Sequence, residues 1–324
     1  MKKVLPAFLT FLLLFNSLIS DSYAGKWRVN NTGISAHFTT VQEAASSASV
    51  LTGDTLYVEG SVTSYGGLTL TKRLTVIGPG YFLGQNPATQ ANLAPSMIDY
   101  LTFSTGSRGS MITGMTILYG VTLQDSAIVM TRNNFSNVTI TEISSDNYFA
   151  QNYLNSMSIS GSSGNTILNN FFGKSNSCAN GNCLSMSNNS SATIKNNMFQ
   201  GCQVINGSLY QNNIATGTDA LGNSTFTATI STVTNNIGAS GQYGNSNGNK
   251  EYIDMSTVFV NTGSEDGRYQ LLPGSPASGA GASGVDCGIF GGSTSYVLSG
   301  VPNLPSVWDI YVNGNTVTVK ALSH

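Results

Sequence analysis

Leu168-Asn169-Asn170-Phe171 is one of six short segments that share a pattern and together decide the fold. The pattern has Asn or Gln in its second position, Asn in its third and a large apolar residue in its fourth. The other five segments are Arg132-Asn133-Asn134-Phe135, Ala150-Gln151-Asn152-Tyr153, Lys195-Asn196-Asn197-Met198, Gln211-Asn212-Asn213-Ile214 and Thr234-Asn235-Asn236-Ile237. Successive third positions are 18, 18, 27, 16 and 23 residues apart. Such a period with variable insertions predicts a solenoid, because each coil returns to the same place while its loops can lengthen.

The third-position asparagines are expected to form a ladder through the solenoid. Its members are Asn134, Asn152, Asn170, Asn197, Asn213 and Asn236. Parallel coils stack about 4.8 Å apart, so an inward-facing amide can bond the amides above and below it. The residue before each segment is mostly apolar and the next is mixed, which is the alternation of a short strand. The pattern leaves open which of the two adjacent amide columns points inward.

The remaining segments extend this interpretation to most of the chain. Leu74-Thr75-Val76-Ile77-Gly78 and residues 111–117 fit the same strands without the Asn. Thr40-Val41-Gln42-Glu43 is a capping box that predicts a helix over residues 40–50, placed as a lid on the first coil. Asn313-Gly314 between alternating apolar residues predicts a hairpin. We therefore predict an all-β fold: a right-handed parallel β-helix over residues 25–300, with this helix as its N-terminal cap, followed by a C-terminal hairpin or tail over 301–324.

The N-terminus has the form of a secretory signal. Met1-Lys2-Lys3 precedes an apolar run, and Ser22-Tyr23-Ala24 is a small-x-small cleavage site, so residues 1–24 are expected to be removed. The apolar run is short for a bilayer and no later segment reaches about 18 unbroken apolar residues, so no transmembrane segment is expected in the mature chain. Only 13 Lys and Arg are present and they are scattered, which argues against a nucleic-acid partner. We expect a protein that is secreted or held on a bacterial cell surface.

Parts of the chain resemble known β-helix proteins. The order of residues 38–45, 53–58 and 74–78 resembles the opening of the pectin-lyase-like right-handed parallel β-helix superfamily, particularly its chondroitinase B-like and alginate lyase branch. The ending, Tyr269-Gln270-Leu271, residues 274–277 and residues 286–292, resembles secreted β-helix proteins of the Bacteroidetes type. Together the similarity covers most of residues 36–300. It implies a fold more than an activity, because the matching residues are those that form turns, strands and caps.

Catalytic candidates are few. Eliminative cleavage of a uronic-acid polysaccharide needs a group that neutralises the carboxylate, such as Ca²⁺ or Arg, and a basic residue. Arg132 and Lys195 occupy the same position of the repeat, although Leu168 intervenes; the alternative is two solvated surface charges. Glu142 and Asp146 could form a carboxylate pair, or be neighbours by chance. With only two histidines in the chain, no metal site is expected, and no cofactor unless Ca²⁺ serves a lyase.

Binding of extracellular polysaccharide, without an assignable catalytic set, is therefore the function that the sequence favours. Exposed tyrosines could stack on sugar rings, although burial in the core is the alternative for each; the candidates are Tyr65, Tyr119, Tyr148, Tyr153 and Tyr243. A polysaccharide lyase with a site built from loops and a structural or adhesion module remain the alternatives. Thr69-Leu70-Thr71, Thr139-Ile140-Thr141 and Thr227-Ala228-Thr229 are not one coil apart in a continuous series, so no regular ice-binding plane is expected.

The four cysteines allow several disulfide pairings. Cys183 and Cys202 are 19 residues apart, one coil of this repeat, so a stacked pair has suitable geometry. Cys178 with Cys183 would close a small turn instead. A third possibility is that these cysteines and Cys287 are all free thiols.

Overall fold

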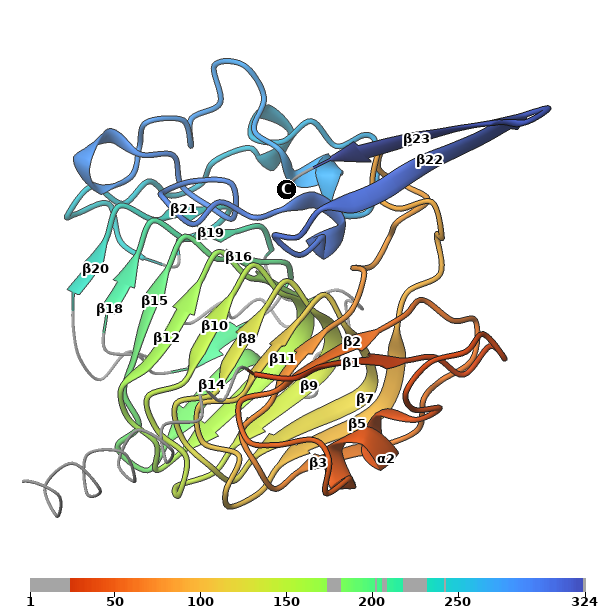
Figure 1. Cartoon of the computed structure of the whole chain (residues 1–324). Helices are drawn as coiled ribbons and strands as arrows, with labels where there is room; N and C mark the ends of the chain where they lie inside the picture. Colours follow the sequence, from red (N-terminus) through yellow and green to blue (C-terminus); the bar gives the residue numbers. More distant parts are fainter. Residues whose placement is uncertain are drawn as a thin grey trace, which may run out of the picture.

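The computed structural model describes residues 24–173, 182–201, 203–205, 209–217, 232–241 and 243–322. Two long β-sheets dominate the described residues, and every strand pair within each of them is parallel. Consecutive strands along the chain mostly alternate between the two sheets (Figure 1). This arrangement is consistent with the predicted parallel β-helix.

The first sheet is built from short strands. In spatial order these are β1 (Lys26–Val29), β2 (Thr55–Val58), β4 (Thr75–Ile77), β6 (Met111–Thr113), β8 (Val129–Thr131), β10 (Tyr148–Ala150), β12 (Asn165–Leu168), β15 (Ala192–Lys195), β18 (Leu209–Gln211) and β20 (Thr232–Thr234). The central residue of most strands is buried, as Val76 is between Thr75 and Ile77. The flanking residues face outward, because successive side chains of a strand point to opposite faces.

The second sheet has longer strands near its N-terminal end. In spatial order these are β3 (Leu68–Leu70), β5 (Met97–Phe103), β7 (Thr116–Leu123), β9 (Asn134–Ile140), β11 (Tyr153–Ser160), β13 (Phe171–Phe172), β16 (Met198–Phe199), β19 (Ile214–Ala215) and β21 (Ile237–Gly238). β11 pairs with β13 through its first residues and with β14 (Asn182–Ser187) through its last, and β14 pairs with β17 (Gln203–Ile205). The sheet therefore divides beyond β11.

The amide ladder lies at the corner between the two sheets. Asn133, Asn152, Asn170, Asn197, Asn213, Asn236 and Asn249 are buried, and each Nδ2 donates to the Oδ1 of the next at 2.9–3.2 Å. Each Nδ2 also donates to a backbone carbonyl of the preceding coil, as Asn170 does to Phe149 at 2.9 Å. The inward column is thus the third position of the pattern.

Asn134 is not a rung of this ladder, which corrects the alignment of the first segment. Asn134 begins β9 and pairs in register with Tyr153, and the rung is Asn133. The first segment has two adjacent asparagines, so the pattern could be aligned on either of them. The backbone register shows that the correct alignment places Asn133, not Asn134, in the ladder. The first interval of the ladder is consequently 19 residues.

The second-position residues form an outward column that holds the C-terminal part of the chain. Residues 280–301, the C-terminal strap, run along this column in the direction opposite to the coil order. Gln151 Nε2 donates to Ser295 O at 2.5 Å, Asn169 Nδ2 to Ile289 O at 2.8 Å, and Asn235 Nδ2 to Ala280 O at 3.2 Å. Figure 1 shows this blue segment along one edge of the stacked coils.

The strap region also covers an outward apolar column. Tyr153, Phe171, Met198, Ile214 and Ile237 are the first residues of successive strands of the second sheet and pack with strap residues such as Ile289 in a second core. Short 3-10 helices punctuate the chain here: η2 (Met255–Thr257), η3 (Gly267–Tyr269), η4 (Ala282–Gly284) and η5 (Leu298–Gly300). The segment after residue 250 is therefore packed onto the outside of the coils.

Helix α2 (Val41–Ser46) begins where the capping box predicts, and the Thr40 side chain accepts a hydrogen bond from the Glu43 backbone. It ends four residues before the expected residue 50, and it contacts β3, β1 and β2. The predicted hairpin is formed by antiparallel β22 (Ser306–Asn313) and β23 (Thr316–Leu322), which project from the body in Figure 1.

Candidate functional site

A cleft of about 510 Å³ lies on the outer face of the first sheet, beside residues 293–304. Its floor is formed by outward side chains of β4, β6, β8 and β10, including Thr113, Thr131 and Tyr148. A neighbouring hollow of about 300 Å³ extends toward β2 and shares Ile77, Pro302 and Leu304 with it. The two hollows therefore adjoin each other across several coils, and together they are called the groove below.

The groove lies where the C-terminal chain crosses the outer face of the coils, next to the hydrogen bonds that Arg132 and Gln151 make with Val301 and Ser295. Short strands present threonines and medium-sized side chains outward, which gives a shallow floor. The strap is anchored at the adjacent corner, and Pro302, Asn303 and Leu304 continue from it over the floor. The lining is mainly apolar, with side chains such as Ile77 and Met111, and it includes neutral amides such as Gln90, Asn92 and Asn303.

Arg132 supplies the positive charge of the groove. Its backbone is left-handed, with a φ of 57°, and its guanidinium donates from Nε to Gln151 Oε1 at 2.8 Å and from Nη1 to Val301 O at 2.9 Å. Burial lowers the pKa of Arg132, and the Tyr81 hydroxyl opposes this shift. Both of these partners are neutral, so within the described residues the guanidinium charge is not compensated by an ion pair.

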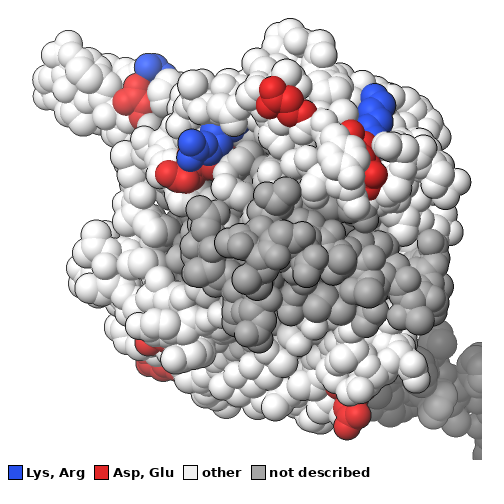
Figure 2. Space-filling model, turned by 180° about the vertical axis from the view of Figure 1, so that it is seen from behind, with Lys and Arg blue, Asp and Glu red and all other residues white. Residues whose placement is uncertain are grey.

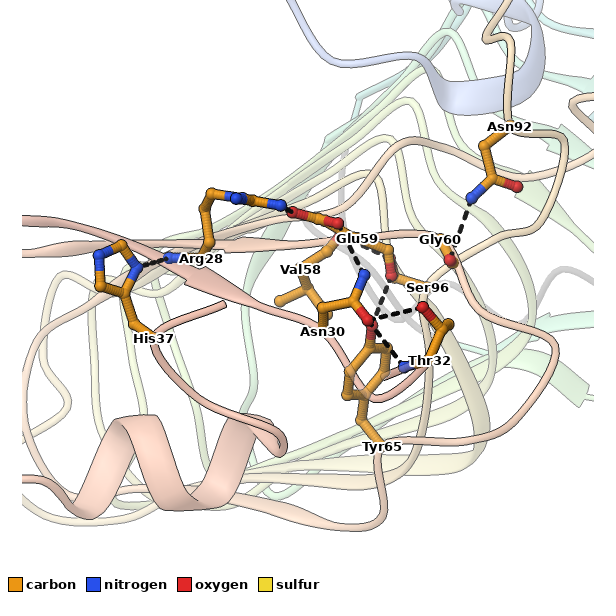
Figure 3. A network of polar contacts seen from close by, with 10 residues as sticks. All are labelled: Arg28, Asn30, Thr32, His37, Val58, Glu59, Gly60, Tyr65, Asn92 and Ser96. Atoms are coloured by element: carbon orange, nitrogen blue, oxygen red, sulfur yellow. Dashed lines mark hydrogen bonds and ion pairs between the residues drawn. The ribbon is translucent and has the colours of Figure 1, made fainter. Parts of the chain in front are cut away.

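Glu59 lies at the opposite end of the groove and is held in a polar network (Figure 3). Its Oε1 pairs with Arg28 at 2.6 Å and its Oε2 accepts from Asn30 Nδ2 at 2.7 Å. The Tyr65 hydroxyl and Ser96 Oγ both donate to the Glu59 carbonyl. Both carboxylate oxygens are thus engaged, so this residue forms a fixed wall of the groove and not a free acid or base.

The four candidate catalytic residues are not brought together. Arg132 belongs to the outward strap-binding column, whereas Lys195 is in register with Leu168 and Gln211 on the outer face of the first sheet. The prediction that Arg132 and Lys195 share a column is therefore wrong, and Thr131 occupies that column in the coil of Arg132. The two lie three coils apart, about 14 Å at the usual strand spacing.

Glu142 and Asp146 lie in the turn between β9 and β10, at the other end of the first-sheet strands from Arg132. Glu142 is exposed, and Asp146 has a left-handed backbone whose N–H donates to Ser163 O at 3.0 Å. Neither residue lines the groove. The turn next to them carries a second buried polar ladder that the pattern did not reveal, in which Asn147 Nδ2 donates to Asn165 Oδ1 at 2.9 Å.

The five candidate tyrosines differ in accessibility. Tyr65 and Tyr153 are buried and Tyr243 packs on Tyr210, so these three belong to cores. Tyr148 is partly exposed in the groove, and Tyr119 is exposed on the second sheet. Tyr100, which the sequence did not single out, is also exposed, and no repeat motif marks its position.

Of the cysteines, Cys183 is disulfide-bonded and Cys287 is a buried free thiol. The alternative in which all four are free is therefore wrong. Cys178 and Cys202 lie outside the described residues, so the stacked Cys183–Cys202 pair remains a prediction. Burial raises the pKa of the Cys287 thiol to about 12.

Comparison with family models, curated proteins and solved structures found no match for this chain. Within the described residues, no helix has both the length and the apolar character needed to cross a membrane. The same part of the chain holds no group of three His, Cys, Asp or Glu side chains arranged to bind a metal ion. Function must accordingly be inferred from the groove and from the two sheet faces.

Proposed function

We propose that this protein binds an extracellular polysaccharide in the groove of the first sheet, without cleaving it. The observation that supports this is the groove itself: it crosses several coils and combines neutral amides and hydroxyls with the ring of Tyr148. Amides and hydroxyls match the hydroxyls of a sugar, and an aromatic ring packs against its apolar face. The length of the groove suits a chain of several sugars.

Binding without cleavage is favoured over lyase activity by the charges of the groove. Among its described lining residues only Glu59 and Arg132 are charged. Glu59 is engaged by Arg28 and Asn30, and Arg132 is anchored to Gln151 and Val301. Elimination needs a base placed at the sugar carbon. Among the described lining residues there is no unpaired carboxylate, lysine or histidine, which leaves only the hydroxyls of Tyr57 and Tyr148 to serve as that base.

The fold and the location that accompany this function are also proposals. A right-handed helix of the pectin-lyase-like kind, with α2 as a lid on its first coil, fits the contacts of α2 with β1, β2 and β3. Secretion to the medium or the bacterial surface would expose the groove to polysaccharide. Release of residues 1–24 on export, seen by mass spectrometry, would support this location.

Affinity electrophoresis in gels containing soluble polysaccharides tests the binding function. We expect retardation by at least one of them, and a loss of about tenfold in affinity for Tyr148→Ala, which corresponds to about 1.4 kcal/mol. Leu209→Ala is the matched control, because Leu209 lies in the same outward column three coils away. Unsaturated, ultraviolet-absorbing products from alginate, pectate or chondroitin would show that the protein is a lyase and would overturn the proposal of binding without cleavage.

A further inference from the structure

The outer face of the second sheet carries an unbroken column of hydroxyl side chains. Strand register places six of them side by side: Thr69, Thr102, Thr122, Thr139, Ser158 and Ser185. At about 4.8 Å between strands the column is about 24 Å long. Thr69 and Thr139 therefore do belong to one continuous series, which corrects the expectation from their spacing; the insertion before β5 had hidden the register. Thr227-Ala228-Thr229 lies outside the described residues.

The hydroxyls in the middle of the column are available to a ligand. Thr102, Thr122, Thr139 and Ser158 are partly or fully exposed, and within the described residues no protein group is bonded to their hydroxyls. Residues two positions later behave differently: Thr141 Oγ1 donates to Leu123 O, and Ser160 Oγ accepts from Asn188. The free hydroxyls thus form one line parallel to the stacking axis and not a two-dimensional lattice.

Two exposed tyrosines flank this line. Tyr100 is 57% exposed and Tyr119 is 56% exposed, and their rings stack at 4.9 Å between centroids with a 32° tilt. They occur at a register shift in which β7 has an extra residue opposite β5. A β-bulge redirects side chains and is common beside binding sites. The two rings form a contiguous exposed apolar patch, which is the kind of surface on which ligands bind.

The charge of this face differs from that of the groove. No charged residue occupies the hydroxyl column, and Asp99 directly precedes Tyr100, where its carboxylate accepts from Ser64 Oγ at 2.7 Å. A carboxylate beside the tyrosines disfavours a polyanionic ligand through like-charge repulsion. In Figure 2, which views the molecule from behind, most of the coloured basic atoms lie beside acidic ones, so no large patch of one sign appears on the described part of that side. The ligand that fits this face is uncharged.

We propose that the Tyr100–Tyr119 pair and the hydroxyl column together bind a neutral, insoluble polysaccharide whose chains lie along the stacking axis. Each Ser or Thr hydroxyl both donates and accepts hydrogen bonds, as sugar hydroxyls do, and a repeated column suits a repeating polymer. The tyrosine rings contact the apolar faces of the sugars. A flexible soluble chain would make few contacts with an open face and would still lose its conformational freedom on binding. A chain in a solid has already lost that freedom, so an open face suits an insoluble polymer better.

This site is separate from the groove of the proposed function, because the two lie on different sheets. Each can therefore fail without the other. Variants of the second sheet should lose binding to solids and keep binding of the soluble polysaccharide in the groove. Tyr148→Ala should lose the soluble polysaccharide and keep binding to solids.

Sedimentation of the full chain with microcrystalline cellulose, chitin, insoluble xylan and insoluble mannan tests the proposal. We expect the protein to sediment with at least one solid. Tyr100→Ala combined with Tyr119→Ala should lower the partition constant about tenfold or more, the effect of losing about 1.4 kcal/mol of stacking. Thr122→Asp combined with Thr139→Asp should lower it similarly, with circular dichroism confirming that both variants fold. Tyr311→Ala, which removes an equally exposed tyrosine from the hairpin, should sediment like the parent.

Three outcomes would overturn the proposal. The first is that the folded parent sediments with none of the four solids. The second is that both double variants sediment as well as the parent, which would place binding elsewhere. The third is that the parent enters growing ice and binds no polysaccharide, in which case the threonine line serves an ice surface.

Discussion

At the residue scale, the buried amides of the ladder are the most sensitive positions. Asn170 Oδ1 accepts from the backbone and the amide of Asn152, while its own amide donates to Asn197. Asn170→Ala leaves these groups buried and unpaired, so we expect a loss of about 1–3 kcal/mol in the free energy of unfolding. Urea titration measures it, with Asn315→Ala on the exposed hairpin turn as the control. Equal midpoints for the two variants would remove the ladder as a source of stability.

The outward column depends on backbone conformation as well as hydrogen bonds. Asn169 has a φ of 52° and donates to Ile289 O and Gly291 O of the strap. Asn169→Gly removes the two hydrogen bonds but takes the left-handed backbone without strain. Asn169→Ala removes the same hydrogen bonds and also strains the backbone. We expect the Ala variant to be less stable than the Gly variant by about 1 kcal/mol, measured by urea unfolding. The reverse order would show that side-chain volume dominates at this position.

Asp54 makes stability depend on pH. Burial alone would raise its pKa, but hydrogen bonds from Trp27 Nε1 and the backbone of Leu51 and Gly25 outweigh burial, so the pKa is lowered. A lowered folded-state pKa gives stability that is present above the unfolded value of about 3.9 and is lost as the pH falls through the folded value. Asp54→Asn should therefore cost most at neutral pH, and the difference from the parent in urea unfolding should shrink toward pH 3. A constant difference would contradict this linkage.

At the scale of elements, the strap and the hairpin should behave differently on truncation. The strap covers the column of Tyr153, Phe171 and Met198, whereas side chains near the hairpin tip, such as Val312 and Val317, are more than half exposed. Removal of residues 308–324 should change the melting temperature by less than about 2 °C, because little buried surface is lost. Removal of residues 279–324 should expose the apolar column and produce binding of a hydrophobic dye or aggregation. Comparable melting temperatures for the two truncations would show that the strap is dispensable.

At the scale of the whole molecule, the two proposed binding faces lie on different sheets, so we expect them to contact two polymers at once. A solenoid has contacts mainly between neighbouring coils, so the faces share little beyond the intervening core. Protein sedimented on an insoluble polysaccharide should therefore still capture the soluble ligand of the groove, with an affinity within about twofold of that in solution. Labelled soluble polysaccharide in the pellet measures this. Competition between the two polymers would place them at one site.

Some features could be predicted because they depend on neighbours in the chain. The start of α2 follows from Thr40 and Glu43, and the hairpin turn from Asn313-Gly314, since both devices close within a few residues. The end of α2 was misplaced, because it depends on where the chain turns toward β2. The Asn column was visible because every coil must satisfy a buried amide at the same corner, yet Asn133 could not be distinguished from Asn134 without the register.

The sequence by itself determined the repeated coil, its turn residues and the amide ladder, because a stacked structure imposes the same local requirement on each coil. Only the tertiary structure decided which distant residues meet. The strap reaches the outward amides from more than 40 residues away at its nearest bond, Asn235 to Ala280, and from 169 residues away at Arg132. The groove, the hydroxyl column and the tyrosine pair likewise arise from strand register and loop length. These are properties of the packed chain that no local pattern encodes.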